Sequence, residues 1–291
     1  MKKYMLMAFA VALFTACEKV DIPDNASEEP ASVVEGKTKK FTFTVKGDFG
    51  TPTFTRGYLL ADGKVMTDLW VFDYVDGAMV QQLHQTNDDE DFGTPTMNLS
   101  HGAHHIYFVA SRGVSPTITT ESHTIIWGTV RDTFWKDYEV SVAATSNGNR
   151  AVTLDRVATK MMVTITDEVP SGCASITITP TMWYYGLNYV DGSVVSAQEK
   201  AISVTVPSSY AGTSGELTVS IFGIGNATEY TTDVSIVAKD GDENVIGSAT
   251  LEDAPFRRNR ATEYSGHMFG SGGAWACALN TTWLEAETLT W

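Results

Sequence analysis

The sequence predicts an all-β protein with two domains, and three observations support this prediction. Short runs rich in Val, Thr and aromatic residues recur along the chain, while long stretches of helical periodicity are nearly absent. Asp-Gly, the dipeptide most typical of tight hairpin turns, begins at positions 62, 76, 191 and 240. The 291 residues suffice for two domains of ordinary size, each with its own core. Regular short strands joined by such turns favour β-sandwiches.

The strong negative charge argues against two classes of partner. A chain with a formal net charge of −15 is repelled by nucleic acid and by an anionic membrane surface. We therefore expect no nucleic-acid partner. The acidity also keeps an exported protein soluble.

The N-terminal segment has the pattern of an export leader. Two lysines precede the apolar stretch 4–14, which is too short to span a bilayer. Two small residues then precede Cys17, and residues 14–17 resemble a bacterial lipobox, in which a peptidase cuts before a diacylglyceryl-cysteine. We expect residues 1–17 to be a lipoprotein signal peptide with Cys17 as the lipid attachment site. The alternative is an ordinary secretory leader that happens to contain a cysteine.

Residues 18–39 are predicted to be a flexible tether. They are rich in Glu, Asp, Ser and Pro and contain few large apolar groups, so they cannot bury enough surface to order themselves. Such a linker would hold the folded part away from the lipid.

The first domain, residues 40–150, is predicted to begin with a half-buried strand. Phe41, Phe43 and Val45 alternate with polar residues, as expected when one face of a strand meets a core. The Gly-, Thr- and Pro-rich residues 47–56 that follow indicate an exposed loop.

A central strand is predicted within residues 66–77. Leu69 and Val71 point to one face and Trp70 and Phe72 to the other, so apolar side chains occur on both faces. A strand of this kind is covered on both sides. The run ends in an Asp-Gly turn.

Further strands and one helix complete the first domain. The helix is expected at residues 120–138, where Ile126, Val130 and Phe134 recur at near-helical spacing and Thr120 could cap the N-terminus. Asn147-Gly148 indicates another hairpin turn. The remaining strands are expected at residues 79–85, 97–99, 106–110 and 138–143.

The second domain, residues 151–291, has the same strand-and-turn pattern. Asp191-Gly192 and Asp240-Gly241 are predicted turns between its strands. The strands are expected at residues 152–156, 161–165, 175–179, 182–187, 202–206, 217–221, 234–238, 245–250 and 281–291.

Four motifs, in order, resemble those of the fimbrillins of type V fimbriae in Bacteroidales. They are the lipobox, the strand Thr-Asp-Leu-Trp-Val-Phe-Asp at 67–73 with its Asp-Gly turn, the segment Leu154–Ile165, and Pro255–Phe269 with its Arg-Asn-Arg-x-Thr run. The resemblance implies two tandem transthyretin-like β-sandwich domains of Greek-key type after the lipoprotein leader and tether. It also implies a structural fimbrial subunit for adhesion, anchored by lipid to the outer membrane and assembled at the cell surface.

The resemblance further implies assembly by strand exchange. In stalk subunits an Arg-specific protease removes the first strand, and a neighbouring subunit supplies the replacement. Here the exchanged strand would carry Phe41, Phe43 and Val45, and the cut would fall between Arg56 and Gly57, in the predicted exposed loop. The implied partners are other fimbrial subunits and ligands on host or bacterial surfaces. Anchor, stalk and tip roles remain open.

A surface glycan-binding lipoprotein of a polysaccharide-uptake system is the alternative function. Such a protein would share the leader, the tether and the β-rich body. The fimbrial interpretation is preferred because it accounts for the four ordered motifs.

The sequence contains no recognisable catalytic constellation, and we expect neither an enzyme nor a cofactor. His101, His104 and His105 are predicted to lie in a solvated turn, because neighbours on a strand point to opposite faces and no acidic residue follows at metal-ligand spacing. The acidic run from Asp240 lacks the Gly and Glu of a calcium loop and is predicted to be a hairpin. No metal site is expected.

The cysteines allow one disulfide. With Cys17 acylated, Cys173 and Cys277 are the remaining pair in an oxidising compartment. A bridge between them would connect the start of the second domain to its end, and two unpaired thiols are the alternative.

Overall fold

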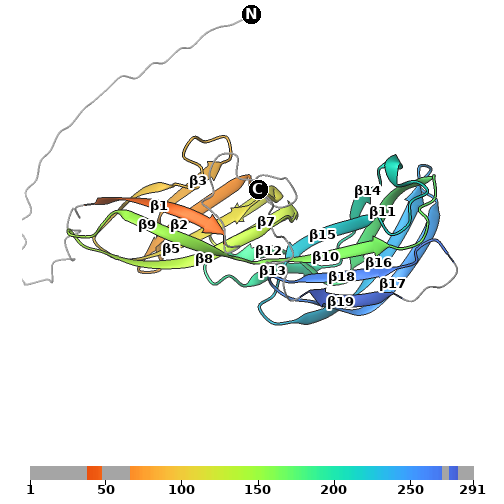
Figure 1. The fold of residues 1–291 in the computed structure, drawn as a ribbon. Helices are drawn as coiled ribbons and strands as arrows, with labels where there is room; N and C mark the ends of the chain where they lie inside the picture. Colours follow the sequence, from red (N-terminus) through yellow and green to blue (C-terminus); the bar gives the residue numbers. More distant parts are fainter. Residues whose placement is uncertain (1–37, 48–65, 271–274, 281–291) are drawn as a thin grey trace, which may run out of the picture. The chain divides into compact units, whose positions relative to one another are not determined.

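The computed structural model describes residues 38–47, 66–270 and 275–280. The predictions for Cys17, for the tether up to residue 37, for Arg56 and Gly57, and for the strand 281–291 lie outside the described residues. Nearly all regular structure in the described part is β-strand (Figure 1), with a single 3-10 turn at Ser208–Tyr210. Within that part no helix is long and apolar enough to span a bilayer. The all-β prediction is confirmed.

A seven-stranded sheet encloses the first core. Its two halves, β3-β2-β5-β8 and β9-β1-β4, are joined through β8 and β9, which pair only at Phe134–Arg156 and Trp135–Asp155. The two halves face each other, since the rings of Phe43 on β1 and Phe108 on β5 lie 5.3 Å apart. The strands are β1 (Lys39–Gly47), β2 (Asp68–Val75), β3 (Ala78–Thr86), β4 (Thr96–Leu99), β5 (Gly102–Ser111), β8 (Thr133–Val142) and β9 (Asn149–Arg156).

Two four-stranded sheets enclose the second core. One has the order β15-β10-β18-β19 and the other β14-β11-β16-β17. Between them lies a cluster of fully buried aliphatic side chains with Trp183 and Phe256. The strands are β10 (Ala158–Ile165), β11 (Cys173–Pro180), β14 (Ile202–Thr205), β15 (Thr218–Ile224), β16 (Tyr230–Asp240), β17 (Val245–Phe256), β18 (Ala261–Gly266) and β19 (Ala276–Asn280).

A fourth sheet, of four strands, combines hairpins that are far apart in the sequence. It contains β6 (Val114–Thr119), β7 (Thr124–Thr129), β12 (Trp183–Asn188) and β13 (Val194–Gln198), with β7 paired to β12. This sheet contributes to a third buried cluster, in which Phe72 of β2 stacks on Tyr189 at 4.0 Å. Trp70 and Phe72 are at most 3% exposed. The prediction that the central strand is covered on both faces is therefore confirmed.

The predicted helix at residues 120–138 is wrong. This stretch forms a turn followed by β7 and the start of β8. Ile125 and Trp127 are both fully buried and lie two residues apart, which is the period of a strand. The stretch is rich in β-branched and aromatic residues and contains Gly128. All of these residue types have low propensity for the interior of a helix.

The Asp-Gly turns within the described residues are confirmed. Asp76 and Gly77 both have positive φ, 51° and 78°, as a two-residue turn between β2 and β3 requires. The turn between β16 and β17 is the predicted acidic hairpin, in which the carboxylate of Asp240 accepts backbone hydrogen bonds from Asp242 and Asn244. These bonds and the Asn244 amide lower the pKa of Asp240.

Candidate functional site

The strand β1 is the feature on which the predicted function depends. Phe41, Phe43 and Val45 are each fully buried, while Thr44 and Lys46 between them are exposed. This alternation confirms the half-buried strand expected from the sequence and places all three apolar side chains in the first core.

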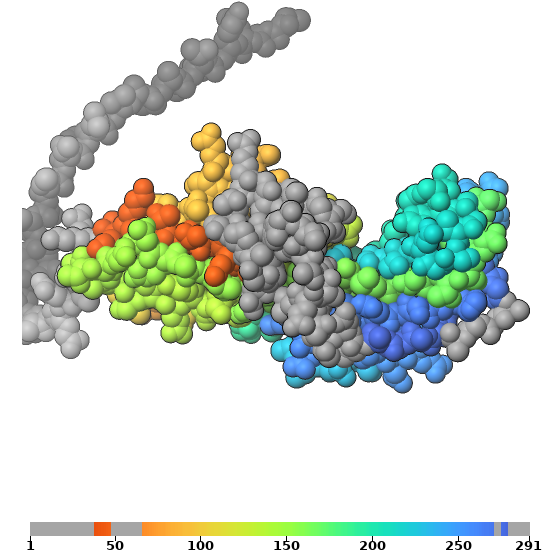
Figure 2. Space-filling view, viewed as in Figure 1, coloured from red at the N-terminus to blue at the C-terminus, as the bar shows by residue number. Residues whose placement is uncertain are grey.

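Both edges of β1 are hydrogen-bonded. Residues 42–47 pair in parallel with 149–154 of β9, and residues 39–42 pair antiparallel with 96–99 of β4. Figure 1 shows β1 beside β9, and Figure 2 shows the two at the surface in orange-red and yellow-green. On the β4 side, hydrogen bonding to β1 extends to the residues that precede β4. The backbone N–H groups of Phe43 and Val45 donate to the carbonyls of Pro95 and Gly93 at 3.0 and 2.9 Å. Without β1, β4 and β9 would have no common neighbour.

Aromatic contacts fix β1 against the opposite half of the sheet. The ring of Phe43 meets Phe108 at 5.3 Å and Tyr138 at 6.0 Å, both edge-on. The guanidinium of Arg150 on β9 lies 5.1 Å from the centre of the Phe41 ring. Such contacts add to the burial energy and give the site a definite shape.

Gly148 brings the backbone of the β8–β9 connection close to β1. Its carbonyl accepts the Thr42 N–H at 2.7 Å, and a Cβ atom at this position would collide with the carbonyl oxygen of Lys40. The predicted Asn147-Gly148 hairpin is therefore wrong. β8 and β9 separate here into the two halves of the sheet, and the glycine is needed for close approach to a third strand.

The predicted solvated turn at residues 101–105 is wrong at His104. His104 lies on β5 and is 2% exposed, and its Nδ1 lies 2.7 Å from Oδ1 of buried Asp73. Its Nε2 donates to the Ser100 carbonyl at 3.0 Å. Burial raises the pKa of the Asp73 carboxyl, opposed by the hydrogen bond from His104. This pair connects β2 to β5 inside the first sandwich.

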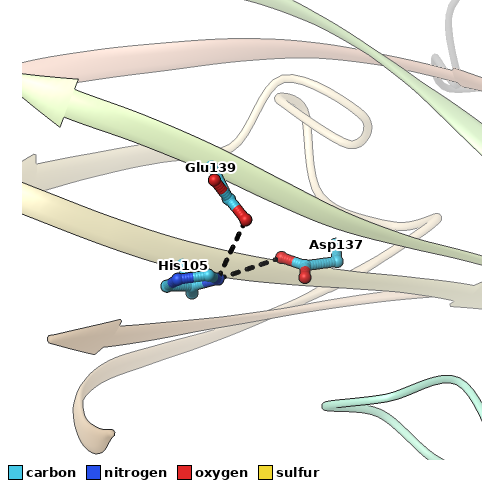
Figure 3. A group of neighbouring side chains, drawn as sticks. All are labelled: His105, Asp137 and Glu139. Atoms are coloured by element: carbon cyan, nitrogen blue, oxygen red, sulfur yellow. Dashed lines mark ion pairs between the residues drawn. The ribbon is translucent and has the colours of Figure 1, made fainter. Parts of the chain in front are cut away.

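The neighbouring residue His105 points outward and meets two acidic side chains of β8 (Figure 3). Its Nδ1 lies 3.5 Å from Asp137 and 3.9 Å from Glu139. The sequence has no acidic residue at metal-ligand spacing from these histidines, and it is the pairing of β5 with β8 that brings the two carboxylates close to His105. The three side chains offer ligand atoms of the kinds that divalent cations bind, within 4.8 Å of one another. His105 and Glu139 are exposed and Asp137 is half-buried, so the ion pairs of this group add little stability.

A disulfide was one of two alternatives for the second-domain cysteines, and the structure has the other. Cys173 and Cys277 are both free thiols, the first buried in β11 and the second exposed on β19. These strands belong to the two different sheets of the second sandwich. Burial raises the pKa of the Cys173 thiol, which lowers its reactivity.

Comparisons with known proteins establish the fold. No family model matches the sequence, and no curated protein matches it either. Among solved structures, a candidate adhesin from Bacteroides ovatus is similar with a TM-score of 0.51 at 10% identity, over 84% of this chain and 94% of that one. A candidate cell adhesion protein from Bacteroides uniformis is similar with a TM-score of 0.51 at 12% identity, over 84% and 98%. The chain therefore shares a fold with these proteins over most of their lengths.

Proposed function

We propose that this protein is a structural fimbrial subunit that is assembled on the cell surface by β-strand exchange and serves adhesion. It is exported as a lipoprotein, attached through Cys17 to the outer membrane, and folded into two tandem domains. These were predicted at 40–150 and 151–291, and because β9 belongs to the first sheet the first domain extends to Arg156. The single observation that carries the proposal is β1, a buried strand hydrogen-bonded on both edges. The shared fold with proteins described as adhesins is consistent with this role.

Removal of β1 would expose a groove suited to another strand. Phe108 and Tyr138 would lose their contacts with Phe43, and the carbonyls of Gly93 and Gly148 would lose their donors. Exposed apolar surface next to unpaired backbone groups is the surface that β-strand addition uses. The occupant would be a strand of a neighbouring subunit with apolar residues at alternate positions.

Proteolysis alone would leave β1 in place. Burial of each apolar side chain stabilises the strand by roughly 1.5–3 kcal/mol, and each backbone hydrogen bond adds about 0.5–1.5 kcal/mol. A cut between Arg56 and Gly57 would leave the pairings of β1 with β4 and β9 intact. Displacement therefore requires a competing strand of similar apolar character, and exchange becomes coupled to assembly.

Mass spectrometry of assembled fimbriae tests the proposal. In a stalk or tip subunit, peptides should begin at Gly57, and no peptide should span Lys46–Leu59. A subunit incorporated with that segment intact would be an anchor without strand exchange at β1. If the protein is absent from isolated fimbriae and is retained on a polysaccharide affinity gel, the fimbrial proposal fails and the glycan-uptake alternative replaces it.

The lipid anchor is tested separately through Cys17. Cys17→Ala should move the protein from the membrane fraction to the soluble fraction, because several acyl chains at ~0.8 kcal/mol per buried methylene are lost. Cys277→Ala serves as the control and should leave the protein with the membrane. A Cys17→Ala protein that still partitions into detergent would contradict the lipobox assignment.

A further inference from the structure

The pairing of β5 with β8 gathers His105, Asp137 and Glu139 at the surface of the first sandwich. His105 lies directly opposite Glu139, and Asp137 lies two residues before Glu139, so the three side chains project from the same face of the sheet (Figure 3). One ring nitrogen and two carboxylate oxygens lie within 4.8 Å of one another. The side chains of His105 and Glu139 are 49% and 75% exposed, so an ion in solution can reach them. We call these three residues the His105 cluster.

The spacing within the His105 cluster is wider than that of a hydrogen-bonded pair. Nδ1 of His105 lies 3.5 Å from Oδ1 of Asp137 and 3.9 Å from Oε1 of Glu139. The neighbouring His104, by contrast, meets Asp73 at 2.7 Å. Ligands at about 2.0–2.2 Å from a tetrahedral Zn²⁺ lie about 3.3–3.6 Å from one another. The shorter distance of the cluster therefore matches two ligands of one ion, and a small rotation of the exposed Glu139 side chain brings in the third.

The oxygen of Asp137 that faces His105 is an unsatisfied acceptor. This Oδ1 is buried and accepts no hydrogen bond from the described residues, although the side chain as a whole is 34% exposed. No lysine or arginine of the described part forms an ion pair with Asp137 or Glu139. A buried carboxylate oxygen without a donor costs free energy, and a cation bound at this atom would remove that cost.

The donor set of the His105 cluster selects the class of ion. An imidazole nitrogen suits Zn²⁺ and other first-row transition metals, whereas Ca²⁺ and Mg²⁺ prefer sites made of oxygen alone. Three protein ligands leave a fourth position around a tetrahedral ion, which water or a group of another molecule fills.

We propose that the His105 cluster binds a divalent transition-metal ion of the Zn²⁺ type. The ion connects β5 to β8, and because it binds the folded chain it stabilises the first sandwich. Neither strand pairs with β1, so the site does not depend on strand exchange. No metal site is apparent from the spacing along the chain, because the ligands come together only through strand pairing.

Calorimetric titration of the untagged, detergent-solubilised full-length protein with zinc chloride, after treatment with a chelator, tests the proposal. Binding should saturate at one ion per chain, and Ca²⁺ should bind more weakly than Zn²⁺. Zn²⁺ should also raise the melting temperature, and protection from hydrogen–deuterium exchange should increase in β5 and β8.

Variants of the ligands locate the site. His105→Gln and Glu139→Gln should each weaken Zn²⁺ binding by at least about tenfold, because loss of a partner that only supports a ligand already costs about 10–100-fold in metal affinity. Both side chains are exposed, and a melting curve without metal checks that each variant is folded.

His84→Gln is the matched control. It removes a histidine of similar exposure, 44%, which contacts a single carboxylate of the same sheet, that of Asp68 at 2.8 Å. This variant should bind Zn²⁺ like the unaltered protein. Equal weakening by His84→Gln, or unchanged binding in Glu139→Gln, would overturn the proposal, because the ion would then bind at surface histidines in general. Absence of saturable binding, or tighter binding of Ca²⁺ than of Zn²⁺, would overturn it as well.

Discussion

Each sandwich contains one parallel strand pair, and the two pairs differ in how they are tied to the chain. In the first sandwich β1 runs parallel to β9, and in the second β18 runs parallel to β10. β18 is held at both ends, since residues 257–260 connect it directly to β17 and it continues toward β19. β1 is the first strand of the described part, and residues 48–67 connect it to β2. A cut in that connection would leave β1 held to the sandwich by its strand pairs and side-chain contacts, whereas β18 has a paired strand before it and another after it along the chain.

The two cores also differ in chemistry. The first sandwich buries Asp73 and His104 as a hydrogen-bonded pair, whereas the buried cluster of the second consists of apolar and aromatic residues and Cys173. The titratable groups of the second core, Cys173 and Tyr264, have pKa values raised by burial, so they ionise only in alkaline solution. The first sandwich is therefore the one whose core contains an acid that titrates in the acidic range.

Truncation of Phe43 should cause the largest difference in stability between the two sandwiches. Phe43→Ala should destabilise the first sandwich by about 3–5 kcal/mol, because a fully buried ring is replaced by a cavity. Hydrogen–deuterium exchange reports the two sandwiches separately, and protection should fall in β1, β4 and β9 while β10 and β18 keep theirs. Thr44→Ala, on the exposed face of the same strand, should change stability by less than about 0.5 kcal/mol. Equal loss of protection in both sandwiches would show that they unfold as one unit.

A methyl group at Gly148 should have a smaller effect on the same strand. Gly148→Ala forces the new Cβ against the Lys40 carbonyl, so the backbone must shift at a cost of about 1–3 kcal/mol. Exchange should rise most at the Thr42 amide, whose acceptor is the Gly148 carbonyl. Gly241→Ala is the control, because nothing lies within 4 Å of a Cβ there. If both variants behave alike, close approach at Gly148 does not hold β1.

The sequence was sufficient for features that depend on local alternation. The buried faces of β1 and β2 follow directly from every second residue being apolar, and the Asp-Gly turns follow from the backbone conformation that glycine permits. The prediction of a helix at 120–138 was wrong. Ile126, Val130 and Phe134 have a helical spacing, but the same spacing also arises when one strand ends and the next begins within the stretch, as β7 and β8 do.

Features that depend on pairing between distant segments could not be predicted. His104 is buried because β5 pairs with β2, which brings it to Asp73, 31 residues earlier in the chain. The pairing of β7 with β12 likewise joins hairpins from different parts of the sequence. Such contacts are set by strand register, which a single sequence leaves open.

The two cores should also differ in how their stability depends on pH, and this is the smallest of the predicted effects. Burial raises the pKa of Asp73 above its ordinary value of 3.8, so the folded state holds this proton more tightly than the unfolded chain does. Its contribution to stability is therefore fully present below pH 3.8 and is lost as the pH rises through the folded-state pKa. Asp73→Asn cannot ionise and still offers a hydrogen bond to His104, so the variant should gain in melting temperature relative to the unaltered protein as the pH rises from about 4.

Asp240→Asn provides a control of opposite sign. Hydrogen bonds from Asn244 lower the pKa of Asp240 in the exposed β16–β17 turn, so its contribution is present above pH 3.8 and is lost as the pH falls. Relative to the unaltered protein, Asp240→Asn should therefore lose melting temperature as the pH rises toward 3.8, below the range in which Asp73→Asn gains it. Parallel melting curves for Asp73→Asn and the unaltered protein would show that the pKa of Asp73 is the same in the folded and the unfolded chain, which contradicts the prediction.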